Sequence, residues 1–417
     1  MTWRGNLAPV VAKRSIDMMK NLIDAADERA EALDRLILRE ADQQLTAVDA
    51  GDIVVLEDSS AALTLHALAR VLDESGTAPR VLVRCRSYQQ AHALRALAHR
   101  LLEGRGQDAA ARLVVAGLDT EALDLEAALA ECSLKPTLAL GRLPKTLAAL
   151  DDWGRALARH SAQTTTDFSL CLGGNTKHMT RTMNTVLEQS FSEVWAGRGQ
   201  GKFRALLARA PRQSVLAHTA EETQIPVGTL RGLGGVFSGG REDRGGSYLA
   251  DIACDLLSTL DRPADGAALR VLDLGCGNGS VSLRLLHRAQ ERGLPLVLTA
   301  TDLDADAVRS ATQTLAPYRT GEQTATVTWD DAAAGSAPGS FDLLLLNPPF
   351  HEGTRLDATM VRPLLDAATR LLAPGGRLLL VHNSHLRYRA QLEDRFEEVE
   401  QLGRNGTFTV LSACNPL

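Results

Sequence analysis

Val271-Leu-Asp-Leu-Gly-Cys-Gly-Asn-Gly279 joins an apolar strand pattern to three glycines at alternate positions, and the helical sequence VSLRLLHRAQER follows. A strand, a glycine loop and a helix in this order let a ligand lie against bare backbone at the carboxyl edge of a parallel sheet. The spacing differs from GxGxxG, and Asp273 at the strand end would repel a pyrophosphate but can hold an ammonium group. We therefore expect Asp273, Gly275, Gly277 and Gly279 to bind a ligand with an amino-acid-like tail.

Similar strand patterns recur along the whole chain, each separated from the next by a segment of helical length. They lie at 52–58, 80–85, 112–117, 137–144 and 167–174, then at 270–277, 296–302, 325–330, 342–349 and 377–383, with a last strand pair in EVEQLGR and GTFTVLSA. Before them, the stretch from about Ser15 to Leu45 has the periodicity of one amphipathic helix. This alternation predicts α/β folds in which a mostly parallel sheet has helices on both faces. At roughly 150 residues per domain, a chain of 417 residues should hold two or three domains, and we expect two tandem Rossmann-like domains, 1–205 and 206–417.

Composition limits the class of protein and its partners. The chain is 45% hydrophobic and 23% charged, and it has neither an apolar run near the ~20 residues of a membrane helix nor a secretory signal, so we expect a cytoplasmic protein without membrane contact. Its six cysteines show no CxxC or Cys/His pairing, which argues against disulfides and against a metal site. The net charge of -6 means that any contact with nucleic acid must come from local basic patches.

Acidic residues end the second and third strands of the second half. Asp302 lies about 25 residues beyond the glycine loop, where an acid can accept both hydroxyls of a ribose. Asp331, with Asp330 as the alternative, could accept an adenine amino group. Each acid alone would more often be a strand-end or helix-cap residue. Their coincidence with the glycine loop favours the binding role.

The fourth strand ends in Asn347-Pro348-Pro349-Phe350. Asn supplies a side-chain carbonyl and the prolines stiffen the turn while leaving backbone carbonyls free, so two acceptors can be fixed toward one NH2 group. Holding both hydrogens of a planar exocyclic amine aims its nitrogen at an electrophile, and Phe350 offers a face for stacking. We therefore expect Asn347, Pro348, Pro349 and Phe350 to form a catalytic acceptor site, with Asn347 also near the bound cofactor.

DLGCGNG, Asp302 and NPPFH together resemble the amino-methylating class I methyltransferases, and in particular the bacterial ribosomal RNA guanine-N2 methyltransferases. The segments GVFSGGREDRGGSYL (235–249) and LPKTLAAL (143–150) extend the likeness over most of the chain. The resemblance implies two tandem class I methyltransferase domains, the first one degenerate. It also implies S-adenosylmethionine as cofactor, ribosomal RNA or a ribosomal subunit as partner, and methylation of a flipped guanine at N2.

The first half lacks the three cofactor motifs. Its first strand leads into Asp58-Ser-Ser-Ala-Ala62, its second carries Arg84 and Arg86 in place of an acid, and Gly141-Arg-Leu-Pro-Lys145 replaces NPPF. We expect this half to bind substrate or to stabilise the other. The cations that could face phosphates, or could be ordinary surface charges, are Arg142, Lys145, Lys177 and Arg181.

Two other functions fit parts of the sequence. A protein glutamine-N5 methyltransferase could use NPPF equally well, because glutamine has the same planar NH2 group. A noncatalytic RNA-binding or ribosome assembly factor would fit the first half alone. The ribosomal subunit, the target nucleotide and the oligomeric state stay open at this point.

Overall fold

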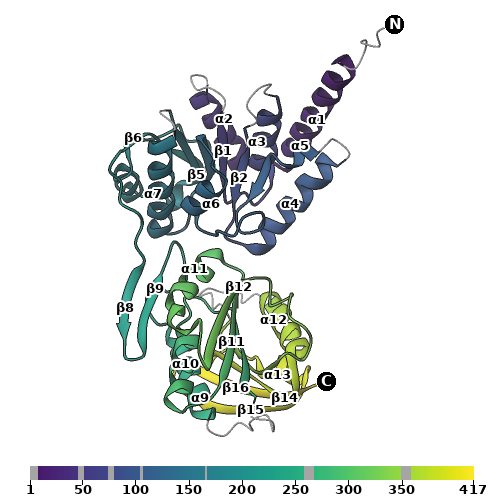
Figure 1. Ribbon diagram of the computed structural model, residues 1–417, viewed down its shortest axis with the longest axis vertical. Helices are drawn as coiled ribbons and strands as arrows, with labels where there is room; N and C mark the ends of the chain where they lie inside the picture. Colours follow the sequence, from purple (N-terminus) through teal and green to yellow (C-terminus); the bar gives the residue numbers. More distant parts are fainter. Residues whose placement is uncertain are drawn as a thin grey trace. The chain divides into compact units, whose positions relative to one another are not determined.

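The computed structural model describes residues 8–45, 51–73, 79–103, 107–164, 167–257, 267–348 and 358–417. The chain forms two compact units, Met1–Thr219 and Ala220–Leu417 (Figure 1). Among the described residues, every helix is too short or too polar to span a bilayer.

The first unit contains a seven-stranded sheet whose first five strands are parallel. In chain order the strands are β1 (Asp52–Leu56), β2 (Val81–Arg84), β3 (Leu113–Val115), β4 (Pro136–Arg142), β5 (Ser169–Asn175), β6 (Phe191–Ala196) and β7 (Phe203–Pro211). Their order in the sheet is β3-β2-β1-β4-β5-β7-β6, with β7 antiparallel to both of its neighbours. The five predicted strands are confirmed, whereas β6 and β7 were not predicted. Because β7 belongs to this sheet, the chain divides after Thr219 rather than between residues 205 and 206.

The helices of the first unit follow its strands. They are α1 (Ala8–Arg29), α2 (Ala32–Leu45), α3 (Ala62–Asp73), α4 (Tyr88–Leu102), α5 (Gln107–Ala110), α6 (Leu125–Glu131), α7 (Leu147–Thr164) and α8 (Arg181–Glu188), with the 3-10 turn η1 (Thr176–His178). The single helix expected from about Ser15 to Leu45 is in fact the two helices α1 and α2. The chain breaks at Ala30 and Glu31, where the Asp34 carboxylate accepts the Glu31 N–H at 3.0 Å.

The second unit repeats the connectivity of the first. Its strands are β10 (Leu269–Leu274), β11 (Leu296–Asp302), β12 (Gln323–Trp329), β13 (Phe341–Leu346), β14 (Leu372–Asn383), β15 (Phe396–Arg404) and β16 (Phe408–Pro416), in the order β12-β11-β10-β13-β14-β16-β15. Its helices are α9 (Arg244–Leu256), α10 (Ser280–Glu291), α11 (Ala305–Thr314), η2 (Ala316–Tyr318), α12 (Ala358–Leu371) and α13 (Arg389–Glu393). A separate hairpin, β8 (Glu221–Ile225) with β9 (Gly228–Gly232), precedes α9. The equal strand order agrees with the two tandem domains of similar fold that the repeated strand patterns predicted.

Both faces of the second sheet are buried, which explains why β13 reads FDLLLL. Leu343 and Leu345 join an apolar cluster with α9 and α10 on one face, whereas Leu344 and Leu346 join a second cluster with α12 on the other. Burying each of these leucines stabilises the fold by roughly 1.5–3 kcal/mol. Because the sheet interior is mostly apolar, polar side chains gather mainly where the parallel strands end, and this edge holds the candidate site.

Candidate active site

The glycine loop after β10 exposes backbone at the carboxyl edge of the sheet. Gly275 and Gly277 have φ of +82° and +55°, a conformation that side chains rarely adopt. The loop is anchored by the N–H groups of Gly275 and Cys276, which donate to the Thr301 carbonyl at 2.9 and 3.0 Å. A Cβ built on Gly275 or Gly277 would meet no atom within 4 Å. The glycines therefore satisfy a backbone requirement and leave open space for a ligand.

Gly279 has a different role in the loop. It begins α10 with φ of +81°, and a Cβ there would lie 3.3 Å from Ala311 of α11. Gly279 is absent from the lining of the cavity described next. Its contribution is to let α10 pack closely against α11.

A cavity of about 340 Å³ opens beside this loop, at the ends of β10, β11 and β13. Its volume falls in the range of small-molecule sites. The residues that line it are Phe237, Ser238, Asp243, Asp273, Gly275, Cys276, Gly277, Asn278, Ser280, Val281, Asp302, Asp304, Ala307, Asn347 and Pro348. Six of the predicted site residues, Asp273, Gly275, Gly277, Asp302, Asn347 and Pro348, therefore meet at one cavity.

Two carboxylates face this cavity, that of the buried Asp273 and that of the partly buried Asp302. Asp302 accepts hydrogen bonds from the N–H groups of Gly277 and Asp304, each at 2.9 Å, and Asp273 accepts one from the Ser282 hydroxyl at 2.5 Å. Burial raises the pKa of each carboxyl to about 6. Within the described part of the chain, neither acid forms an ion pair with Lys, Arg or His. Two desolvated acids without a cationic partner fit a ligand that carries positive charge and hydroxyl groups.

Asn347 follows β13 and is held by Asp243, the N-cap residue of α9. Its Nδ2 donates to Asp243 Oδ2 at 2.9 Å, and the same carboxylate oxygen accepts the Gly246 N–H at 2.7 Å. An ionised carboxylate can only accept, so this contact fixes which end of the Asn347 amide is which. The Asn347 Oδ1 is buried and has no hydrogen-bond partner among the described residues. Within that part of the chain, the site thus contains an oriented acceptor that lacks a donor.

Sequence reasoning did not assign Asp243 a role, although it lies in the quoted segment 235–249. Asn278 was missed as well: its Nδ2 donates to the carbonyls of Gly239 and Arg241 at 2.9 and 2.8 Å and so ties that segment to the glycine loop. Phe237 also lines the cavity while 69% exposed. An N-cap acid at the start of a helix was the available signal for Asp243.

The other predicted positions lie apart from this cavity or outside the described residues. Asp330 accepts the N–H groups of Asp331 and Gly335 at 2.6 and 3.2 Å, and neither Asp330 nor Asp331 is part of the cavity lining. Pro349 and Phe350 lie outside the described residues. Among the described residues, no group of three or more His, Cys, Asp or Glu side chains could hold a metal ion.

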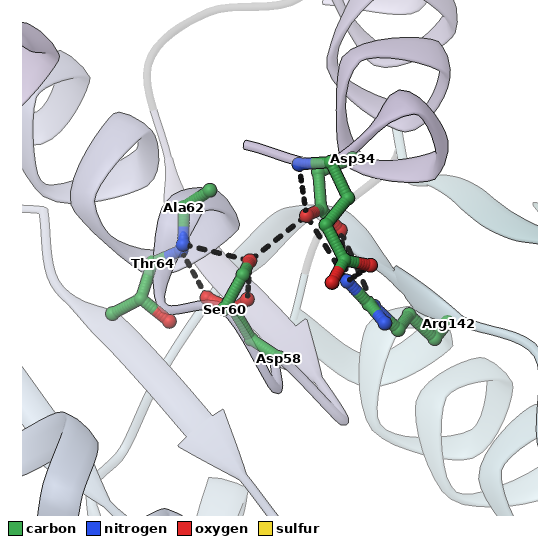
Figure 2. Close-up of polar contacts among 7 residues, drawn as sticks. Asp34, Asp58, Ser60, Ala62, Thr64 and Arg142 are labelled. Atoms are coloured by element: carbon green, nitrogen blue, oxygen red, sulfur yellow. Dashed lines mark hydrogen bonds and ion pairs between the residues drawn. The ribbon is translucent and has the colours of Figure 1, made fainter. Parts of the chain in front are cut away.

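The same edge of the first unit is filled by its own side chains (Figure 2). Asp34 of α2 is fully buried and receives Arg142 from the end of β4 at 2.8 Å. Ser60 donates to both Asp34 and Asp58, at 2.9 and 3.1 Å, and Asp58 accepts the Thr64 N–H at 2.8 Å. This network occupies the place where a glycine loop would leave room for a ligand.

Two arginines that the sequence placed at this edge interact with side chains of the same unit. Burial alone would lower the pKa of the Arg142 guanidinium, but Asp34 and Glu31 outweigh that effect and raise it. Arg142 therefore pairs within the protein rather than facing a phosphate. Arg84 is 1% exposed, lies 3.3 Å from Glu57 and stacks on Trp153 with 5.9 Å between guanidinium carbon and ring centroid.

Family models match both units. Residues 24–212 match the RLMG N-terminal domain, and residues 228–412 match the methyltransferase small domain. A search of solved structures finds a 16S rRNA N2 methyltransferase from T. thermophilus, in complex with AdoMet and guanosine, with a TM-score of 0.64, 21% identity and 92% of each chain covered. This likeness supports the fold of both units.

Curated relatives match over long stretches. The ribosomal RNA large subunit methyltransferase G of Pseudomonas aeruginosa strain UCBPP-PA14 is 33% identical over 280 residues, which is 66% of this chain and 70% of the relative. The ribosomal RNA small subunit methyltransferase C of Chromohalobacter salexigens is 35% identical over 185 residues, 44% of this chain and 51% of the relative. On this coverage and identity, the chain belongs to the family of ribosomal RNA large subunit methyltransferase G.

Proposed function

We propose that the second unit transfers a methyl group from S-adenosylmethionine to the exocyclic N2 amine of a guanine in ribosomal RNA, in the cytoplasm. Relatives named as ribosomal RNA methyltransferases support this reaction, as does a structural neighbour in complex with AdoMet and guanosine. The long match to a large subunit methyltransferase favours large subunit RNA as substrate. The observation that carries the proposal is the oriented Asn347 oxygen, which has no hydrogen-bond partner among the described residues, at the cavity that the carboxylates of Asp273 and Asp302 also line.

The residues of the cavity fit this cofactor. Asp273 would hold the ammonium group through its hydrogen-bond network, and Asp302 would accept the ribose hydroxyls with the lone pairs that its two backbone contacts leave free. Gly275 and Gly277 would lie against the cofactor, while Gly279 would act through the packing of α10. Asp331 follows β12, whose Trp329 is in register with Asp302 of β11, and would accept the adenine amino group.

On the acceptor side, Asn347 Oδ1 would accept one hydrogen of the guanine amine and the Pro348 carbonyl the other. These acceptors orient the nitrogen and favour loss of its proton as the new bond forms. When bound, S-adenosylmethionine supplies the electrophilic methyl group. Phe350 would stack on the flipped base, and Pro349 would stiffen the turn that carries it. Asp243 would act as a positioning residue, because it touches Asn347 rather than the substrate.

Replacing Asn347 by alanine tests this assignment. Turnover should fall by about two to three orders of magnitude, the usual loss when one preorganised polar partner is removed, while affinity for S-adenosylmethionine should fall far less. Single-turnover methylation of rRNA from cells that lack the gene gives the rate, and mass spectrometry of the nucleosides identifies the product. Asn184→Ala on α8 is a matched control outside the cavity. Methylation by Asn347→Ala at the wild-type rate would remove Asn347 from the acceptor site.

A further inference from the structure

The first unit has an open pocket beside its filled edge. The pocket measures about 320 Å³, and it is lined by Leu143, Pro144, Lys145, Gly174, Asn175, His178, Met179 and Met183. Leu143, Pro144 and Lys145 follow β4, whereas the others come from the end of β5, from the segment leading into α8 and, for Met183, from α8 itself. Leucine, proline and two methionines give an apolar surface, and the remaining side chains add a cation and two polar groups. Such a mixture is typical of small-ligand sites.

The matching strand orders show which part of the edge this pocket represents. β4 holds the position of β13 beside the central strand, and β5 holds the position of β14. In the second unit, the residue after β13 is Asn347 of the proposed acceptor site. The Asp34 network fills the cofactor side of the first unit, but the space at the ends of β4 and β5 remains open. In the first unit, side chains therefore fill the position that corresponds to the cofactor site of the second unit, whereas the position that corresponds to its acceptor site is open.

The charges around this pocket favour an anionic ligand. Lys145 lines it, and Lys177 and Arg181 flank its other lining residues in sequence; all three are exposed and have no acidic partner in the described parts of the chain. No lining residue is acidic. The carboxylates of Asp34 and Glu31 on this edge are paired with Arg142. A positive rim around an apolar floor matches a phosphodiester with its base turned inward.

We propose that this pocket binds one unpaired nucleotide of the RNA substrate. The base lies against Leu143, Met179 and Met183, and Lys145 and Lys177 contact its phosphates. The proposal rests on the proposed function, since it takes RNA as the substrate. The first unit would then hold a second nucleotide of the substrate, in a pocket at the position that corresponds to the acceptor site of the second unit.

Charge reversal on the full-length protein tests the contact. Lys145→Glu and Lys177→Glu should each raise the Kd for a protein-free, single-stranded rRNA fragment about tenfold and lower the slope of log K against log salt by about 0.7. Affinity for S-adenosylhomocysteine and the turnover of saturating RNA should not change. Lys135→Glu is the matched control, because Lys135 is exposed and lies at the opposite end of β4. If the two variants bind RNA like Lys135→Glu, the proposal is overturned.

Cross-linking separates base binding from general attraction. A fragment that carries 4-thiouridine should cross-link to peptides containing residues 143–145 or 174–183, and the Lys145→Glu exchange should reduce the yield. Cross-links that avoid these peptides would overturn the pocket. A defect seen only with ribosomal particles and absent with protein-free RNA would assign the surface to a ribosomal protein and also overturn it. The proposed function is tested independently of this pocket, and it fails if the wild-type protein forms no N2-methylguanine.

Discussion

Asp243→Ser should slow methyl transfer without loosening the helix that Asp243 caps. In the wild-type protein one carboxylate oxygen caps α9 through the Gly246 N–H and also holds Asn347 Nδ2. Serine is a good N-cap residue, so α9 stays capped. Its shorter side chain does not replace the acceptor for Asn347. The amide then loses the contact that fixes the positions of its nitrogen and oxygen.

The size of the effect follows from that contact. A hydrogen bond of 2.9 Å to an ionised carboxylate contributes about 1.5–3 kcal/mol. If this energy is used to hold the amide, its loss lowers the single-turnover rate about 10- to 100-fold, since each 1.36 kcal/mol is a factor of ten. The loss should stay below that of Asn347→Ala, because the Asn347 oxygen is still present. Asp243→Asn retains an oxygen acceptor and should recover most of the rate.

Three measurements decide the outcome. Single-turnover methylation gives the chemical step, calorimetry gives cofactor affinity, and thermal unfolding reports on the cap. For Asp243→Ser we expect a reduced rate of methyl transfer, with cofactor affinity and the thermal unfolding midpoint close to those of the wild-type protein. If Asp243→Ser methylates at the wild-type rate, Asp243 does not position Asn347. A rate that falls only together with the unfolding midpoint would also contradict the argument, because it would indicate a purely structural role.

The full chain should bind one S-adenosylhomocysteine, and calorimetry that finds two binding sites would contradict the conclusion that side chains fill the edge of the first unit. Asp302→Ala should weaken the binding by about 1.5–3 kcal/mol, since the ribose loses a charged acceptor. Burial raises the pKa of Asp273 and Asp302 to about 6, so cofactor affinity should rise about tenfold between pH 5 and 7 for each carboxylate that must be ionised, and then level off. A cofactor affinity that does not change with pH would mean that neither carboxylate must ionise. Stability of the ligand-free second unit should change in the opposite sense, falling as pH rises from about 4 to about 6, because both folded pKa values exceed the unfolded value near 3.9. Asp34→Ala should destabilise the first unit by about 3 kcal/mol in urea titrations and leave cofactor affinity unchanged. This value is at the low end for a broken buried ion pair, because the Arg142 side chain is 21% exposed. An unaltered urea midpoint would mean that the Asp34–Arg142 pair contributes little to stability.

Local sequence patterns were sufficient for the parallel strands of both sheets and for one side of the site. The glycine loop, Asp273 and Asp302 could be predicted because each lies at the end of a strand, and parallel strands bring those ends to one edge. Asn347 could be placed for the same reason.

Contacts between distant side chains could not be predicted in this way. Asn347 and Asp243 are 104 positions apart, and Arg142 and Asp34 are 108 apart, so neither pair produces a local pattern. The sequence did place arginine at the edge of the first unit, but it could not show that an acid on α2 would take up its charge. Strand β7 was missed because its partner β5 lies before α8 and β6, and because the expected domain boundary after residue 205 falls inside it.

The filled edge of the first unit also affects how the chain responds to its surroundings. Arg142, Ser60 and the Thr64 N–H supply partners for the buried acids of that edge, so its folded state is complete without a small molecule. The second unit keeps Asp273 and Asp302 in a cavity whose described lining residues include no Lys, Arg or His, and a ligand that binds only the folded form stabilises it by RT ln(1 + [L]/Kd). At a hundredfold excess over Kd this amounts to about 2.7 kcal/mol. We therefore expect the folding stability of the second unit to rise with the concentration of its cofactor, and that of the first unit to stay unchanged.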